Sequence, residues 1–124
     1  MKRWCFILLF LITFIHAEEL NFFTSLEQAK QEAQREEKPL LVMFTQVGCP
    51  ACEYMKDVVF EDEILSSYMF TQFVLVELDI NTQSIPQGLK VYGTPTFYVL
   101  KANGEKVGRQ FVGGAKAPAF LKIL

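Results

Sequence analysis

Residues 40–52 read LLVMFTQVGCPAC. The run Leu40–Thr45 is apolar except at its end, which predicts a central strand covered on both faces. The next segment, Glu53–Val59, can be helical, and Pro50 suits the first helical turn because its missing N–H costs nothing there. These residues therefore predict a strand, a turn and a helix, with a Cys-x-x-Cys motif at the turn.

The two cysteines of this motif are placed for redox chemistry. The thiol of Cys49 lies at the predicted helix N-terminus, where the positive end of the helix dipole favours the thiolate. The thiol of Cys52 lies close enough to close a disulfide with it. Thiolate is the attacking species in disulfide exchange. We therefore expect Cys49 to attack and Cys52 to resolve, as the catalytic residues of a dithiol–disulfide couple.

The helices before and after this motif have recognisable starts. Thr24 can pair with Glu27 as a capping box, which predicts a helix from about Leu26 to Glu37. Glu61 or Asp62 can cap a second helical stretch after the active-site helix. The side chains that we expect to face inward from the active-site helix and this second stretch are Tyr54, Met55, Val58 and Val59, then Ile64, Leu65, Tyr68 and Met69.

The rest of the chain predicts strands and a closing helix. The polar segment 81–90 is expected to be mainly loop, and Asn103-Gly104 is a strong hairpin signal. The remaining elements are expected at Phe73–Leu78, Thr96–Leu100, Lys106–Val112 and, as a helix, Ala117–Leu124. Strands that alternate with helices and end in an antiparallel pair indicate an α/β fold with a sheet of mixed direction.

The first 17 residues are typical of a secretory signal. Lys2 and Arg3 precede an almost wholly apolar run, Trp4–Ile15, and Ala17 is a plausible cleavage site before Glu18. An uncleaved membrane anchor is the alternative, but the apolar run is shorter than the roughly 18 residues that spanning requires. The sequence thus predicts a signal peptide at 1–17, one domain at 18–124 and a periplasmic location, with a membrane-anchored form less favoured.

Cleavage after Ala17 would change the composition of the chain. It would leave 107 of the 124 residues, the right size for one domain with a single core. The formal charge would move from −2 to −4, and two cysteines but no histidine or tryptophan would remain. An even pair of cysteines in an exported protein favours a disulfide. A mildly acidic chain without a basic cluster gives no support for nucleic-acid binding. We also expect the protein to be a monomer.

Several motifs occur in an order that resembles the thioredoxin superfamily. The matching pieces are residues 39–44 (PLLVMF), 49–52 (CPAC), 92–97 (YGTPTF), 103–104 (NG) and 113–114 (GG). Over residues 24–124 the chain is similar to exported thioredoxin-like proteins, including the C-terminal thioredoxin-like domain of the membrane reductase DsbD. The resemblance implies a thioredoxin-like fold, with a central mixed β-sheet flanked by helices, and thiol-disulfide oxidoreductase activity.

The resemblance also assigns a role to the Gly93–Thr96 loop. It implies that Pro95 is cis and lies against the cysteines, a rare backbone form that usually marks a functional turn. In the family, the backbone beside this proline pairs with the bound substrate as an extra strand. Carried over, this makes Thr94 and Pro95 the substrate-binding residues.

Two positions depart from the pattern of many thioredoxins. Gly48 stands where many have a tryptophan before the first cysteine. Met43 stands where many have a buried aspartate that takes the proton of the second cysteine. Two acceptors stay open for the proton of Cys52. One is Glu53, which adjoins Cys52 in sequence, and the other is water.

Other uses of a cysteine pair fit the sequence less well. The spacing, the helix start and Pro95 argue against an inert structural disulfide. Haem attachment needs Cys-x-x-Cys-His, and Glu53 follows Cys52. A structural zinc site needs about four ligands, whereas the mature chain would offer two thiols. We therefore expect no cofactor and no metal. A Cu(I)-handling dithiol protein is kept as an alternative function, because two thiolates suit Cu(I).

The direction of electron flow depends on more than the motif. Reduction, oxidation and isomerisation share one attack on sulfur, and the redox potential and the electron partner decide between them. Similarity to the exported reducing branch favours a reductase of protein disulfides; a disulfide oxidase or isomerase is the alternative. The expected partners are client proteins with disulfides and a membrane electron donor of the DsbD type.

Overall fold

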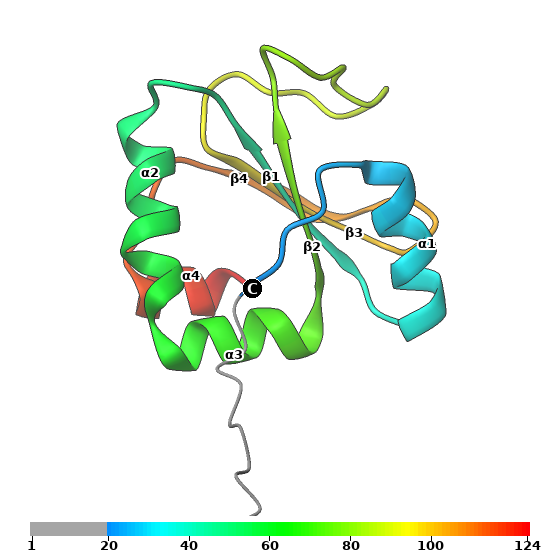
Figure 1. Cartoon of the computed structure of the whole chain (residues 1–124), viewed down its shortest axis with the longest axis horizontal. Helices are drawn as coiled ribbons and strands as arrows, with labels where there is room; N and C mark the ends of the chain where they lie inside the picture. Colours follow the sequence, from blue (N-terminus) through cyan, green and yellow to red (C-terminus); the bar gives the residue numbers. More distant parts are fainter. Residues whose placement is uncertain (1–19) are drawn as a thin grey trace, which may run out of the picture.

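The computed structural model describes residues 20–124, so the predicted signal segment 1–17 lies outside the described residues. Figure 1 shows a sheet with helices on both sides. The helices are α1 (Leu26–Glu36), α2 (Pro50–Asp57), the short 3-10 helix η1 (Val59–Glu61), α3 (Glu63–Gln72) and α4 (Ala117–Ile123). The strands are β1 (Leu40–Thr45), β2 (Val74–Asp79), β3 (Thr96–Leu100) and β4 (Lys106–Val112).

The sheet is of mixed direction, as the sequence predicts. Its strand order is β2-β1-β3-β4, with β1 parallel to β2 and antiparallel to β3, and β3 antiparallel to β4. Every residue of β1 is buried, because this strand has a neighbour at each edge and helices over both faces. Phe23 adds a short parallel bridge beside Val76, at the outer edge of β2.

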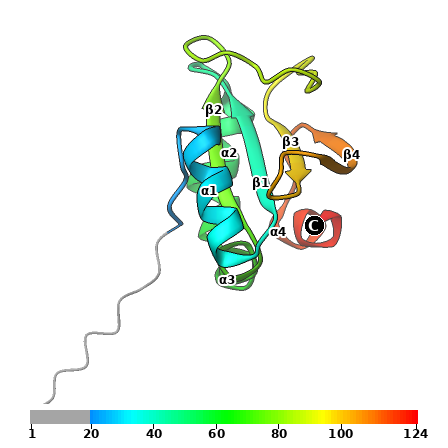
Figure 2. The ribbon, with the colours of Figure 1, turned by 90° about the vertical axis from the view of Figure 1, so that its right-hand side faces the viewer.

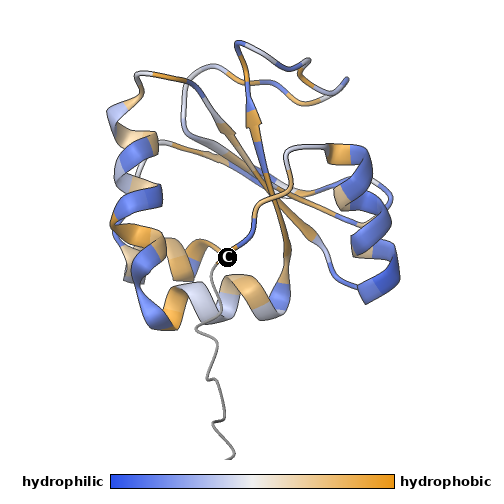
Figure 3. Cartoon of the chain, in the orientation of Figure 1, coloured by the Kyte–Doolittle hydropathy of each residue, from blue (hydrophilic) through white to orange (hydrophobic). Residues whose placement is uncertain are grey.

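Helices cover the two faces of the sheet unequally. In Figures 1 and 2, α1 lies against one face, and α2, α3 and α4 lie on the other side. Side chains of β1 alternate between these faces. Leu41 and Met43 join the core that includes Cys52 of α2. Val42 joins the core that includes Ala29 of α1. The central strands accordingly colour mainly as hydrophobic in Figure 3, while much of α1 is hydrophilic.

Helix α1 begins at Leu26, as predicted, but its capping residue differs from the prediction by one position. The N-cap is Ser25, whose hydroxyl accepts a hydrogen bond from the backbone N–H of Gln28 at 3.3 Å. Thr24 lies just outside the helix, and its carbonyl accepts a hydrogen bond from the side chain of Gln83 at 2.5 Å. Because Ser25 takes the capping position, the capping-box pairing of Thr24 with Glu27 was wrong.

Fewer side chains of the segment from α2 to α3 are buried than the sequence predicts. Four of the expected inward residues are buried, namely Met55, Val59, Leu65 and Met69. The other four are exposed, at 40 % for Tyr54, 56 % for Val58, 73 % for Ile64 and 37 % for Tyr68. Each buried pair is spaced four residues apart and forms a single stripe along its segment. The prediction was wrong for the flanking four because it assumed a wider apolar face.

The remaining elements lie close to their predicted positions. Strand β2 begins at Val74, because Phe73 still caps the end of α3. Asp62 is the N-cap of α3, and its carboxylate accepts a hydrogen bond from the N–H of Leu65 at 2.9 Å. Asn103 and Gly104 connect β3 to β4, as the hairpin signal predicts. Within residues 20–124, no helix combines the length and the apolar character that crossing a membrane requires.

Candidate active site

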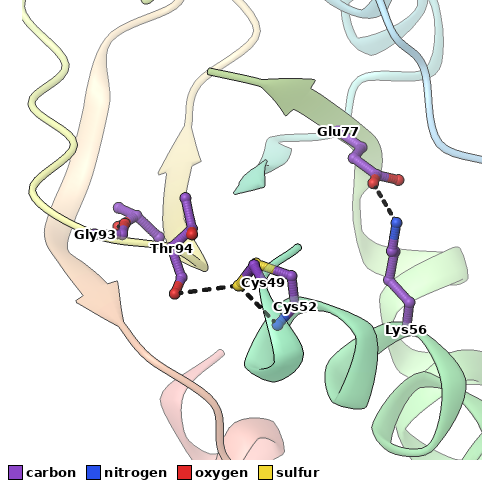
Figure 4. Close-up of a disulfide and its surroundings, with 7 residues drawn as sticks. Cys49, Cys52, Lys56, Glu77, Gly93 and Thr94 are labelled. Carbon is purple, nitrogen blue, oxygen red and sulfur yellow. Dashed lines mark hydrogen bonds and ion pairs between the residues drawn. A yellow bond between two sulfur atoms is a disulfide. The ribbon is translucent and has the colours of Figure 1, made fainter. Parts of the chain in front are cut away.

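The two cysteines lie together where β1 gives way to α2. Strand β1 ends at Thr45, a short turn follows, and α2 begins at Pro50 with Cys49 as its N-cap. Cys52 lies in the first turn of the helix, and its Cα is 5.3 Å from that of Cys49. The two sulfurs form a disulfide, drawn in Figure 4. The structure thus brings the predicted pair together at a strand-to-helix turn.

The sulfur of Cys49 takes the place of a capping oxygen. The backbone N–H of Cys52 donates a hydrogen bond to Cys49 Sγ at 3.1 Å. Free N–H groups at a helix start stabilise negative charge on such an acceptor. Cys49 is 6 % exposed and Cys52 only 1 %. The first sulfur therefore combines the better-stabilised position with the greater access to a partner.

The loop that precedes β3 lies against this pair. The Thr94–Pro95 peptide bond is cis, and the carbonyl oxygen of Thr94 is 3.5 Å from Cys49 Sγ. A reduced thiol can donate a hydrogen bond to that oxygen, whereas the disulfide sulfur has no proton to donate. The carbonyl of Pro95 accepts a hydrogen bond from the N–H of Gly113 at 2.8 Å, which ties the loop to the end of β4. Figure 4 shows Thr94 facing the disulfide.

The glycine before the first cysteine has a backbone reason. Gly48 has a φ of 79°, in the left-handed region that a residue with a Cβ adopts only at a cost. A tryptophan at this position would therefore strain the turn as it stands. Beside it, Val47 is 85 % exposed, and Tyr92, just before the Thr94 loop, is 78 % exposed. Sequence reasoning did not single out Val47, since apolar character alone does not reveal exposure.

A pocket of about 370 Å³ opens behind Cys52. Its lining includes Cys52, Glu53, Lys56 and Glu77, and the Nζ of Lys56 is 2.8 Å from an Oε1 of Glu77. The ammonium and the carboxylate are both partly shielded from solvent. Sequence reasoning missed this ion pair, because its partners are 21 positions apart and lie on different elements. The alternation of β2 could have placed Glu77 on the α2 side of the sheet.

Comparison with known proteins identifies the family. The thioredoxin-like domain family matches residues 26–124, most of the chain. The chain belongs to the thioredoxin-like family. A solved thioredoxin from Thermus thermophilus is 28% identical, with a TM-score of 0.70 over 86% of this chain and 85% of that one. This fold with its Cys49–Cys52 pair is the arrangement of a thiol-disulfide oxidoreductase.

DsbD proteins are also similar to this thioredoxin-like chain. The thiol:disulfide interchange protein DsbD of Campylobacter jejuni (strain RM1221) is 27% identical over 97 residues, which cover 74% of this chain and 17% of DsbD. The chain therefore spans about a sixth of the length of the curated relatives that it matches. The oxidised C-terminal domain of Neisseria meningitidis DsbD shares the fold, with a TM-score of 0.64 and 16% identity over 83% of this chain and 96% of that one.

Proposed function

We propose that this protein reduces disulfides in client proteins through the Cys49–Cys52 couple. The observation that carries the role of Cys49 is the hydrogen bond from the N–H of Cys52 to Cys49 Sγ at the start of α2, and the likeness to DsbD favours reduction over oxidation. The same group can stabilise a Cys49 thiolate in the reduced protein. The deeper burial of Cys52 supports a division of labour in which Cys49 meets the client and Cys52 acts only afterwards.

The reaction takes place in two exchange steps. The Cys49 thiolate attacks one client sulfur, the client disulfide breaks, and the released client thiolate takes a proton from water. The Cys52 thiol then loses its proton and attacks Cys49 Sγ, which breaks the mixed disulfide and releases the second client thiolate. The client gains two electrons, and the cysteine pair loses two as it closes its own disulfide.

Thr94 and Pro95 are proposed to contact the client. Their support is the approach of the Thr94 carbonyl to Cys49 Sγ, together with the family resemblance. A client segment seated there would have its disulfide beside the attacking sulfur. Exposed Tyr92 shortly precedes Thr94 in the chain, and exposed Val47 shortly precedes Cys49. Both offer apolar surface around such a segment.

The proposed setting is the periplasm. The support is the Lys2-Arg3, apolar-run and Ala17 pattern of the sequence, with the likeness to DsbD. In an oxidising compartment a reductase must be supplied with electrons. We therefore propose redox partners of two kinds, disulfide-containing clients and a membrane electron donor of the DsbD type.

Insulin reduction tests the proposed activity. Catalytic amounts of the protein, with dithiothreitol as the electron source, should speed the precipitation of insulin chains well beyond dithiothreitol alone. The Cys49→Ser variant should lose this effect, because the attacking sulfur is gone. Insulin precipitation that is no faster with the wild-type protein than with Cys49→Ser would overturn the proposal. Tight stoichiometric Cu(I) binding in that case would favour a metal carrier instead.

A further inference from the structure

We propose that Glu77, held by Lys56, accepts the proton that Cys52 must lose in the second exchange step. This role rests on the proposed function, because it concerns the step that resolves the mixed disulfide. Buried Met43 stands at the position where many thioredoxins have a buried aspartate. The proton acceptor for Cys52 must therefore be another group.

Strand pairing places Glu77 directly beside Met43. The two residues are partners in the parallel register of β1 and β2, so their side chains leave the same face of the sheet. That face carries α2, because Met43 and Leu75 pack in the same core as Cys52. The Glu77 carboxylate therefore lies beside Met43, on the face of the sheet that carries α2 and the buried Cys52.

The pocket behind Cys52 connects the two groups. Cys52 and Glu77 both line its space of about 370 Å³, which is ample for several water molecules. A water between the Cys52 thiol and the Glu77 carboxylate could pass the proton from one to the other. Figure 4 shows Glu77 and Lys56 meeting on the β2 side of the cysteine pair.

Lys56 acts as the positioning residue for this carboxylate. It lies one helical turn after Cys52, and its Nζ donates a hydrogen bond to Glu77 Oε1 at 2.8 Å. The backbone of Glu77 is also fixed, because its N–H donates to the carbonyl of Phe23 at 2.9 Å. Strand and ion pair together hold the acceptor on the helix side of the sheet.

The other charged groups at the pocket fit the role less well. Its titratable or charged lining consists of Cys52, Glu53 and Lys56 from α2, with Glu77 and Asp79 from β2. The turn after β1 and the loop after β2 supply only neutral groups, among them Gln46 and Gln83. Asp79 already accepts a hydrogen bond from the N–H of Asn81 at 2.8 Å. Glu53 is an exposed residue on the helix surface.

A two-step single-turnover experiment tests the role. Reduced protein is mixed with a chromogenic aromatic disulfide, which releases one coloured thiolate on attack by Cys49 and a second when Cys52 resolves the adduct. The key variant is the double substitution Lys56→Met with Glu77→Gln, because Glu77→Gln alone would leave an unpaired cation beside Cys52. Glu53→Gln is the matched control, since it removes another carboxylate that lines the same pocket.

The double variant should release the first thiolate at the wild-type rate and the second at least about tenfold more slowly at pH 7. This loss is smaller than the rate enhancement that general-base catalysis typically supplies. The second step of the double variant should then speed up about tenfold per pH unit, as unassisted thiol ionisation requires, and approach the wild-type rate near pH 9. The wild type and Glu53→Gln should show a fast second step that depends much less on pH. Thermal unfolding of each variant separates lost stability from lost proton transfer.

Two results would overturn the role of Glu77. One is a double variant with a wild-type second step at every pH, even if its stability falls, since that marks a purely structural ion pair. The other is a Glu53→Gln variant that slows as much as the double variant. A wild-type protein that shows no first step would instead overturn the proposed function, and this role with it.

Discussion

The sulfur of Cys49 accepts a hydrogen bond from the backbone N–H of Cys52, with an N–S distance of 3.1 Å. Two cysteines only three positions apart therefore have different surroundings. The first takes the capping position at a helix start, and the second supplies the N–H and is more deeply buried. This asymmetry predicts that the two sulfurs react at different rates and in a fixed order.

Single serine variants should separate the two roles. Cys52→Ser should still attack client disulfides but hold them as stable mixed disulfides, because the resolving sulfur is missing. Cys49→Ser should trap almost nothing, since Cys52 is 1 % exposed. Non-reducing gels and mass spectrometry of each variant incubated with a disulfide-bonded client give the measurement. Equal trapping by both variants would contradict the assignment.

The turn before Cys49 should depend on its glycine. Gly48→Ala should lower the free energy of unfolding by about 1 kcal/mol, because a Cβ is disfavoured at its positive φ of 79°. Gly93→Ala is the control, since its added Cβ also meets open space but its φ lies outside the left-handed region. Urea unfolding of both variants checks this. A Gly48→Ala protein as stable as Gly93→Ala would show that the turn tolerates a side chain.

The corrected cap of α1 makes a separate prediction. Ser25→Ala should destabilise the protein by about 1 kcal/mol, because the N–H of Gln28 loses its hydrogen-bond acceptor. Thr24→Ala should change stability by less than about 0.5 kcal/mol, as expected for an exposed residue whose side chain caps nothing. Denaturant midpoints of the two variants decide the matter. A larger loss for Thr24→Ala would restore the cap that the sequence predicted.

The closing helix should be held to the core mainly by one aromatic ring. Phe120 is fully buried, and its ring centroid lies 4.8 Å from that of Phe97 in β3. Phe120→Ala should therefore cost about 3 to 5 kcal/mol of stability. Ile123→Ala, on the same helix but 47 % exposed, should cost far less. Calorimetry of both variants would refute this packing account if the two losses were similar.

The sequence predicted best what depends on neighbouring residues. The apolar run of β1, the Pro50 helix start and the Asn103-Gly104 turn carry their signals within a few positions. These signals placed Cys49 and Cys52 correctly at a strand-to-helix turn. The closeness of Thr94 to Cys49, which lie 45 positions apart, could be inferred only through the family resemblance.

What the sequence missed depends on the packing of distant elements. The Lys56–Glu77 pair forms only because parallel pairing sets Glu77 beside Met43, on the side of the sheet that α2 covers. Tyr54 and Val58 are apolar, yet only the fold shows that they are 40 % and 56 % exposed. The shift from Thr24 to Ser25 as helix cap reflects two adjacent residues of nearly equal capping ability.

The reduction potential of the Cys49–Cys52 couple tests the central claim most directly. It is measured by equilibrating the protein with dithiothreitol or glutathione buffers and counting free thiols after acid quenching. A reductase requires a potential more negative than about −200 mV, toward the thioredoxin value and away from that of DsbA. A potential above about −180 mV, in the range of protein disulfide isomerase and DsbA, would contradict the account and favour an oxidase or isomerase.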